Sequence, residues 1–371
     1  MKEVLNKIVE NILVGDGSEL FEAIITFDES KMQELITFLE YHRLDLFFWE
    51  KVKCRDIEAL FSEKQITSFK EKEQNYRFRH RNQIEVAKEI STLFHENELD
   101  FVFLKGLSLS LTKYDNGWCR YFSDIDILMP KKSAKEGARL LIENGYQYGS
   151  LCKSSDPNAP CFIHRASQQE IYFSEVFTHE LYNLVKVKEN GFISNIDINF
   201  EFSWQGLSND RTKNLPFGLI KNRIKSFYFD NVELPIFEET VQFLHLCCHL
   251  YNEAIYFALD STYKGGDPKE LLLFRVFDLI KFNELTLDKE LLFGLAEQFG
   301  LLDKIKYSLC ILRELFHRDI KLLLDEKEMT NEELSVYYSK SKMKQTWPID
   351  IMTRIYDLNE KEKVCQTLSW K

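Results

Sequence analysis

The stretch that decides the fold reads Asp124-Ile-Asp-Ile-Leu-Met-Pro130. It alternates polar and apolar residues at its start and stops at a proline, which is typical of a β-strand. Two aspartates two positions apart on a strand point to the same face of the sheet. We therefore expect Asp124 and Asp126 to present their carboxylates together.

A turn lies upstream of this strand. The apolar run Asp100-Phe-Val-Phe-Leu104 predicts a short buried strand, and Lys105-Gly106 ends it. Residues 107–113 look like the first turns of a helix, whose free N–H groups attract an anion. The absence of a side chain at Gly106 lets a phosphate approach the backbone closely. The residues that we expect near such a phosphate are Lys105, Gly106, Ser108 and Arg120.

A third acid stands on a later strand. Residues 196–202 alternate strictly, with apolar side chains on one face and Asp197, Asn199 and Glu201 on the other. Asp197 is thus the candidate that completes a metal site with Asp124 and Asp126, or that accepts the proton of an attacking hydroxyl. We predict that strands over 100–104, 124–129 and 196–202 lie in one sheet.

The cluster of acids suits magnesium or manganese, which prefer hard oxygen ligands. Such ions activate a nucleophile and stabilise the pyrophosphate that leaves a nucleoside triphosphate. A lone Asp-x-Asp pair on an amphipathic strand is usually only a solvated face, and that interpretation stays open. Three neighbouring features favour the catalytic interpretation: the glycine turn before the pair, Arg120 between that turn and the pair, and Asp197 downstream.

Helical patterns flank the strand-rich segment. Residues 1–98 contain no proline and only two glycines, and the spacing of apolar residues predicts helices over about 31–51 and 67–97. After Pro235 the pattern turns helical again. The sequence therefore indicates a helical N-terminal region (1–98), a strand-rich core (99–235) and a helical C-terminal region (236–371) that closes the cleft.

Local signals place further elements. Ser133-x-x-Glu136 reads as a capping box for a helix over 134–144, which Gly145 ends. Asp267-Pro-x-Glu270 reads as a second capping box, for a helix through about 282. Strand-like stretches are expected near 146–150, 161–166 and 170–178.

Composition excludes several classes of protein. Hydrophobic residues make up 44% of the chain, and aromatic residues 14%, too many for a disordered protein. Asp and Glu outnumber Lys and Arg by 59 to 48, so the formal charge is −11, which argues against non-specific binding along nucleic acid. The eight cysteines form no CxxC pair, which argues against a zinc ribbon. We find no signal peptide and no long apolar run, and expect a cytoplasmic protein without membrane association.

Other polar residues allow a structural and a functional interpretation. His245 and His249 stand at i and i+4, as zinc ligands would, but satisfied buried histidines are commoner. Asp278 follows Arg275 by three residues in an apolar helix, a spacing that permits an ion pair. The functional interpretation is that His249 or Asp278 lines the pocket for the acceptor or the base. We favour the structural interpretation for both.

In the order of its motifs, the chain resembles the uncharacterised nucleotidyltransferase family of bacteria, a branch of the polymerase-β-like superfamily. The resemblance spans about residues 30–285. The motifs that carry it are Tyr41-His-Arg-Leu-Asp-Leu46, Leu104-Lys-Gly106, Arg120, Asp124-x-Asp126, Asp197, Leu244-His-Leu-Cys-Cys-His249 and Arg275-Val-Phe-Asp278. The chain departs from the family at Asn199, where a histidine is more frequent, and in its longer gap between Gly106 and Asp124.

The resemblance implies an α+β fold with a mixed-sheet polymerase-β-like core and helical regions on both sides. It implies a transferase that uses Mg²⁺ or Mn²⁺ and a nucleoside triphosphate, ATP among them, with Asp124, Asp126 and Asp197 as metal ligands. We expect transfer of a nucleoside monophosphate to a hydroxyl of a small molecule, a peptide or a protein. Two alternatives stay open: a catalytically inert nucleotide-binding scaffold, and a tRNA-modifying toxin of related fold.

Overall fold

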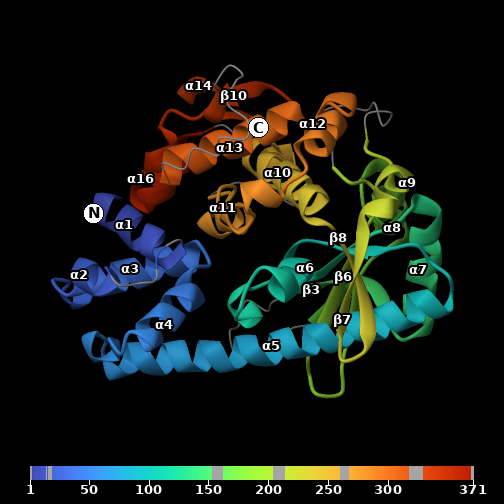
Figure 1. Cartoon of the computed structure of the whole chain (residues 1–371), viewed down its shortest axis with the longest axis horizontal. Coiled ribbons are helices and arrows are strands. Elements are labelled where there is room, and N and C mark those ends of the chain that lie inside the picture. The colour runs from blue at the N-terminus through green and yellow to red at the C-terminus, as the bar shows by residue number, and fades with distance from the viewer. Residues whose placement is uncertain are drawn as a thin grey trace. The chain divides into compact units, whose positions relative to one another are not determined.

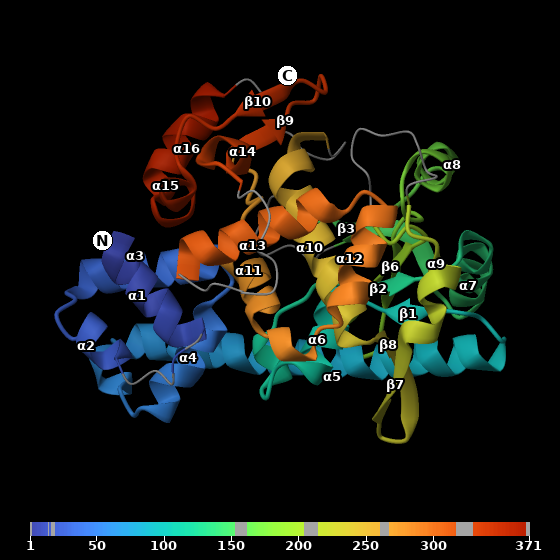
Figure 2. The same cartoon turned by 45° about the horizontal axis from the view of Figure 1, so that its top comes forward.

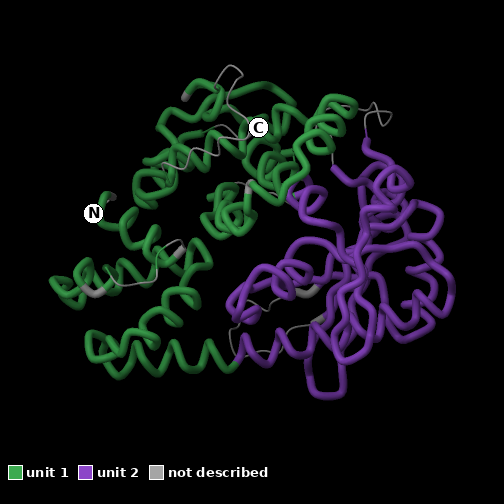
Figure 3. Tube along the Cα trace, viewed as in Figure 1, with its two compact units in different colours: residues 1–74, 206–209, 246–371 green, residues 75–205, 210–245 purple. Residues whose placement is uncertain are grey.

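The computed structural model describes residues 2–13, 15, 19–152, 162–203, 214–259, 267–316 and 329–368. The chain divides into two compact units (Figure 3). The sheet unit comprises residues 75–205 and 210–245, and the helical unit comprises residues 1–74, 206–209 and 246–371. Two long helices, α5 (Glu63–Glu96) and α10 (Glu239–Tyr256), each contribute residues to both units.

The sheet unit is built on one mixed sheet of eight strands, in the order β4-β3-β5-β6-β2-β1-β8-β7. At its centre β2 runs parallel to β6 and antiparallel to β1, and β1 runs parallel to β8. The three strands predicted to share a sheet are therefore neighbours in it. The strands are β1 (Val102–Phe103), β2 (Ile125–Leu128), β3 (Gln147–Cys152), β4 (Phe162–Arg165), β5 (Leu184–Val187), β6 (Ile193–Asn199), β7 (Ile224–Phe229) and β8 (Val232–Phe237).

Helices cover both faces of this sheet. Helix α6 contacts β2 from one side, and α7 contacts β5 and β6 from the other. Figures 1 and 2 show α6 and α7 on opposite sides of the central strands. The helical elements of this unit, besides parts of α5 and α10, are α6 (Lys105–Thr112), η2 (Gly117–Cys119), α7 (Lys131–Glu143), α8 (Gln168–Phe177), α9 (Phe217–Ile220) and η4 (Lys221–Arg223).

The core of the sheet unit explains why the acids point away from it. Four isoleucines of β2 and β6 are at most 1% exposed and belong to one core cluster with apolar residues of α5 and α7. They are paired across the two strands as Ile125↔Ile196 and Ile127↔Ile198. Because successive side chains of a strand alternate between faces, the residues between the isoleucines must lie on the opposite face.

The helical unit contains one two-stranded sheet besides its helices. Its first elements are α1 (Lys2–Leu13), α2 (Leu20–Ile24), α3 (Glu29–Tyr41), α4 (Asp45–Cys54) and η1 (Glu58–Leu60). Its later elements are η5 (Phe257–Leu259), α11 (Leu273–Ile280), η6 (Glu284–Thr286), α12 (Lys289–Gln298), α13 (Leu302–Phe316), α14 (Asn331–Leu334), β9 (Val336–Tyr338), β10 (Lys344–Thr346), α15 (Ile351–Tyr356) and α16 (Leu358–Thr367).

The predicted capping box at Asp267 and Glu270 is wrong. Helix α11 begins only at Leu273, and Lys269 has a positive φ of 48°. Glu270 is completely buried instead, 3.0 Å from Lys361 Nζ and 3.3 Å from Arg354 Nε. The carboxylate of Asp267 accepts a hydrogen bond from Tyr41 Oη at 2.7 Å. Both acids thus make contacts with residues far away in the sequence, which a local motif cannot reveal.

Three other local predictions differ from the structure. The helix expected over 31–51 is broken between α3 and α4, where Arg43 takes a positive φ of 56°. The strand expected over 170–178 is helix α8, because Ser167 and Glu170 form a capping box that starts it. Ser133 does not cap α7, because that helix already begins at Lys131, after Pro130.

Among the described residues, every helix is too short or too polar to pass through a lipid bilayer.

Gly106 packs against an aromatic ring. A Cβ atom at this position would lie 2.3 Å from Cβ and 2.7 Å from Cγ of Phe122, much closer than van der Waals contact. Phe122 is itself part of the buried core, so it has little room to move. The structure thus gives Gly106 a packing role, whereas its role toward phosphate stays a prediction.

We expect Gly106→Ala to lower the free energy of unfolding by about 1–3 kcal/mol, because overpacking displaces Phe122. Gly218→Ala is the matched control in the same unit, since a Cβ there meets nothing within 4 Å. Urea unfolding followed by tryptophan fluorescence measures both variants. Equal stability of the two variants would contradict the packing role.

Candidate functional site

Two of the predicted acids are paired directly across the central strands. Asp126 of β2 is in register with Asp197 of β6, and the flanking isoleucine pairs are buried. Adjacent strands lie about 5 Å apart, so paired side chains on one face are close neighbours. Asp124 precedes β2 and stands two residues before Asp126, which places it on the same side. The three predicted carboxylates therefore converge.

A fourth carboxylate, which the sequence did not indicate, joins this face. Glu180 forms an antiparallel bridge with Asn199, between hydrogen bonds from Leu181 N to Ile198 O and from Phe200 N to His179 O. The bridge continues the ladder on β6 and directs Glu180 to the face that carries Asp197. The prediction of a strand over 170–178 was wrong, and it gave no reason to place Glu180 beside β6.

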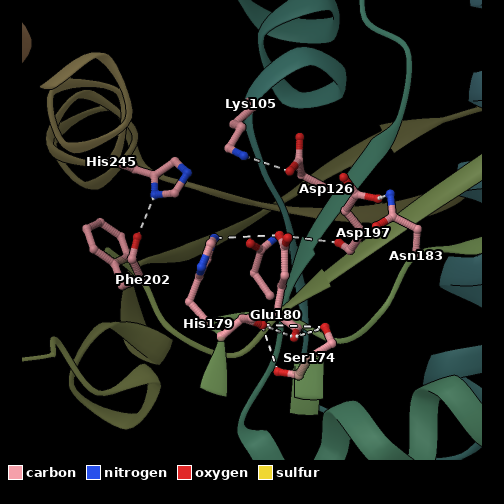
Figure 4. Close-up of polar contacts among 11 residues, drawn as sticks. Lys105, Asp126, Ser174, His179, Glu180, Asn183, Asp197, Phe202 and His245 are labelled. Carbon is pink, nitrogen blue, oxygen red and sulfur yellow. Dashed lines mark hydrogen bonds and ion pairs between the residues drawn. The ribbon is translucent and has the colours of Figure 1, made fainter. Parts of the chain in front are cut away.

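Residues at the C-terminal end of α8 hold Glu180 in place. The backbone carbonyl oxygen of Glu180 accepts hydrogen bonds from Ser174 Oγ at 3.0 Å and from Thr178 Oγ1 at 2.8 Å. Its carboxylate lies 3.6 Å from Nε2 of His179. Figure 4 shows Glu180 and His179 below Asp126 and Asp197, with Ser174 beneath them.

Lys105 supplies a positive charge to the group of acids. Its Nζ donates to Asp126 Oδ1 at 2.7 Å from the first residue of α6, where φ is +45°. Burial alone would lower the pKa of Lys105, but the charges of Asp126, Asp124 and Glu180 outweigh burial and raise it. The ammonium therefore stays charged and partly neutralises the carboxylates.

One lysine does not balance the acids. Burial raises the pKa of Asp197 well above its ordinary value, and the charges of Asp124, Asp126 and Glu180 raise it further. Burial and then the charge of Asp126 raise the pKa of Asp124 as well. The site thus has an excess of negative charge, which a bound cation would relieve.

Two asparagines support Asp197 on its far side. Asn183 donates from Nδ2 to Asp197 Oδ1 at 2.6 Å. Asn199 is buried, and its Nδ2 lies 3.4 Å from the carbonyl oxygen of Asp197. Asn199 is the position at which the sequence departs from the family pattern. Its side chain therefore contacts the backbone of Asp197.

The remaining residues predicted near phosphate lie around α6. Ser108 is 1% exposed and donates to the carbonyl of Lys105 at 3.1 Å, so its hydroxyl supports the start of the helix. Arg120 is buried, and its Nη1 donates to the carbonyl of Tyr121. Among the residues predicted to lie near phosphate, Lys105 thus contacts an acid of the site, Asp126.

His245 of α10 also faces the acids. Its Nδ1 makes a hydrogen bond to the carbonyl oxygen of Phe202 at 3.0 Å, and the residue is 7% exposed. Figure 4 shows the other edge of the ring turned toward Lys105 and Asp126. Burial, and then the charge of Lys105, lower the pKa of His245 to about 4, so the ring is neutral at pH 7.

The donor set suits a hard divalent cation, because carboxylate oxygens from neighbouring strands provide its preferred ligands. Within the described ranges, however, no group of three or more His, Cys, Asp or Glu side chains is already arranged to hold a metal ion. At the acids, the ammonium of Lys105 takes one oxygen of Asp126.

The other polar pair singled out from the sequence lies in the helical unit. Arg275 makes an ion pair with Glu253 at 3.1 Å and donates to the carbonyl oxygen of Glu270. Asp278 is buried in α11. Arg275 thus pairs with Glu253 of α10 and not with Asp278, the partner that its spacing in the sequence suggested.

We expect Asp197→Asn to raise the melting temperature at pH 7, because it removes a destabilised charge while its oxygen still accepts from Asn183. The pH dependence has a defined sign. The folded wild type holds a proton on Asp197 more tightly than the unfolded chain does, so stability falls as pH rises from about 4 through the raised pKa.

In Asp197→Asn, stability should fall less as pH rises than it does in the wild type. Asp115→Asn, an exposed aspartate in the same unit, is the control and should leave the melting curve unchanged at each pH. Calorimetry between pH 4 and 8 measures all three proteins. A lower melting temperature for Asp197→Asn at pH 7 would contradict the charge excess.

Comparison with known proteins identifies the family of the chain. Residues 28–317 match the family described as uncharacterised nucleotidyltransferase. No curated protein matches the chain. The matched range includes every acid of the site, together with Lys105 and His245. It covers most of the chain, and the protein is therefore a member of the uncharacterised nucleotidyltransferase family.

Proposed function

We propose that this protein transfers a nucleoside monophosphate from a nucleoside triphosphate to a hydroxyl group of a small molecule, a peptide or a protein. The observation that supports this most is the register of Asp126 with Asp197 beside Asp124. In the reaction, the acceptor oxygen bonds to the α-phosphorus, the bond to the bridging oxygen breaks, and pyrophosphate leaves with the electron pair.

The phosphate end of the site is the start of α6. Leu104 donates its backbone N–H to the carbonyl of Asp126, so the first turn of the helix lies beside the acids. Free N–H groups of a helix N-terminus and an adjacent ammonium both attract phosphate oxygens. We assign Lys105 to the triphosphate, with Gly106, Ser108 and Arg120 shaping this end.

The cation that the acids would hold is Mg²⁺ or Mn²⁺. Asp124, Asp126 and Asp197 would be its ligands, and it would neutralise charge on the triphosphate and the leaving pyrophosphate. Positioning and charge neutralisation dominate catalysis of phosphoryl-type transfer, so the fixed register of the strands matters more than any single pKa.

The proton of the attacking hydroxyl needs an acceptor. Asp197 is suited to this role, because Asn183 fixes its carboxylate and the lysine of the site pairs with Asp126 rather than with Asp197. The proton then passes to solvent after pyrophosphate leaves. Asp197→Asn would remove the acceptor and keep the hydrogen bond from Asn183.

The charge of the site bears on the acceptor molecule. Four carboxylates on one face and a chain of net charge −11 repel a polyanion. This disfavours the tRNA-modifying alternative and favours an acceptor that is neutral or positively charged. A small molecule, a peptide or a protein surface meets that condition.

A nucleotide-binding scaffold without activity is the second candidate. The observation that favours it is the ion pair of Lys105 with Asp126, which already satisfies one carboxylate. Titration with Mn²⁺ followed by electron paramagnetic resonance separates the two functions. An enzyme binds Mn²⁺ in a manner that depends on Asp126, whereas an inert scaffold that relies on Lys105 does not.

We expect magnesium with a nucleoside triphosphate to raise the melting temperature of the wild type and not that of Asp126→Asn. A ligand at one hundred times its Kd stabilises by about 2.7 kcal/mol, which a melting curve resolves. The asparagine keeps the size of the side chain but removes one charge. The same variant should abolish release of pyrophosphate.

The four common triphosphates are tested one at a time, and Asp115→Asn serves as the charge-matched control that keeps the response. If the wild type shows no shift with any triphosphate, the proposed function fails. If wild type and Asp126→Asn shift equally, then Asp126 is not part of the site.

A further inference from the structure

His245 carries a nitrogen that the proposed reaction does not use. The carbonyl oxygen of Phe202 can only accept, so the hydrogen bond at 3.0 Å places the ring hydrogen on Nδ1. Nε2 then carries a lone pair and no hydrogen. Edge-to-face packing against the ring of Phe202, with centroids 5.1 Å apart, fixes the orientation of the imidazole.

Nε2 is a buried polar atom without a hydrogen-bond partner among the described residues. Such atoms are rare in folded proteins, because an unmet hydrogen bond costs about 1–3 kcal/mol. In Figure 4 this edge of the ring faces Lys105 and Asp126. The unmet atom therefore belongs to the same site as the carboxylates, and a ligand at that site can satisfy it.

The chemistry of Nε2 limits what it can bind. A neutral imidazole nitrogen with a lone pair accepts hydrogen bonds and repels phosphate oxygens, which are also acceptors. Because Mg²⁺ and Mn²⁺ prefer oxygen ligands to an imidazole nitrogen, we take the group that Nε2 binds to be an O–H or N–H donor. The proton of the reacting hydroxyl goes to Asp197 in the proposed reaction, so Nε2 requires a second donor on the acceptor molecule.

We propose that His245 is a specificity-determining residue of the acceptor site, which takes a polyhydroxyl compound whose second hydroxyl lies beside the reacting one. This inference rests on the proposed nucleotidyl transfer. The first hydroxyl loses its proton to Asp197 and bonds to the α-phosphorus, while pyrophosphate leaves. The second hydroxyl keeps its proton, donates to Nε2 and orients the first.

The direct test uses as acceptors two alcohols that differ by a single hydroxyl, 1,2-propanediol and 1-propanol. Each is supplied at the same concentration with a magnesium–triphosphate, and pyrophosphate release and the mass of the alkyl nucleotide are measured. One hydrogen bond is worth roughly tenfold, so the wild type should favour the diol by about that factor.

Two variants of His245 separate its two nitrogens. His245→Asn keeps an amide N–H near the position of Nδ1, for Phe202, and removes Nε2. His245→Gln places an amide oxygen near the position of Nε2. We expect His245→Asn to lose the preference for the diol and His245→Gln to recover most of it. A purely structural role would not change this ratio.

A second measurement needs neither nucleotide nor turnover. In protein labelled with ¹⁵N-histidine, the signal that His245→Asn removes identifies residue 245. The diol should move the Nε2 resonance of the wild type, whereas 1-propanol should move it much less. Equal responses to the two alcohols, or no response to either, would overturn the proposal even where neither alcohol accepts a nucleotide.

Two further outcomes count against it. If His245→Asn keeps the preference for the diol, another residue binds the second hydroxyl. Loss of the melting shift with magnesium–triphosphate in a folded His245→Asn shows that Nε2 serves the nucleotide instead. Failure of the wild type to shift with any triphosphate overturns the nucleotidyl transfer itself, and the resonance measurement still decides whether His245 binds a polyol.

Discussion

The register between β2 and β6 is the constraint on which the candidate site depends. Isoleucine pairs on one face are buried against α5 and α7, and this burial fixes which residues stand opposite each other. A slip of β6 by one residue would turn Asp197 into the core and Ile196 and Ile198 out of it. Apolar packing on one face thus sets the distance between charges on the other, and the acids need no attraction of their own to stay together.

Much of this arrangement could be predicted from the sequence, because a period of two is visible in both strands. The alternation around Asp124, Asp126 and Asp197 gave the correct faces and the correct sheet. The family resemblance, over about residues 30–285, agrees with the matched range of 28–317. The alternation is a local feature of the sequence, so no knowledge of the tertiary packing was needed.

What could not be predicted depends on contacts between distant segments. Glu180 reaches the site through its bridge with Asn199, and His245 through the packing of α10 against Phe202. The capping box at Asp267 failed for a related reason, because buried partners such as Lys361 compete with a helix start for the same carboxylates. Local motifs describe what a side chain is able to do, and the tertiary structure selects one of those options.

In the proposed function, the ion pair of Lys105 with Asp126 would link the binding of the cation to the binding of the triphosphate. A divalent ion bound to Asp126 would compete with the ammonium for its carboxylate, and a partly buried ammonium without an anion is costly. A triphosphate would give that ammonium a new partner at the start of α6. Each ligand would therefore lower the free-energy cost of binding the other, and by thermodynamic reciprocity the coupling would be equal in both directions. In the proposed function the lysine would thus make the metal and the nucleotide a heterotropic pair, and without them it is an internal counterion of Asp126.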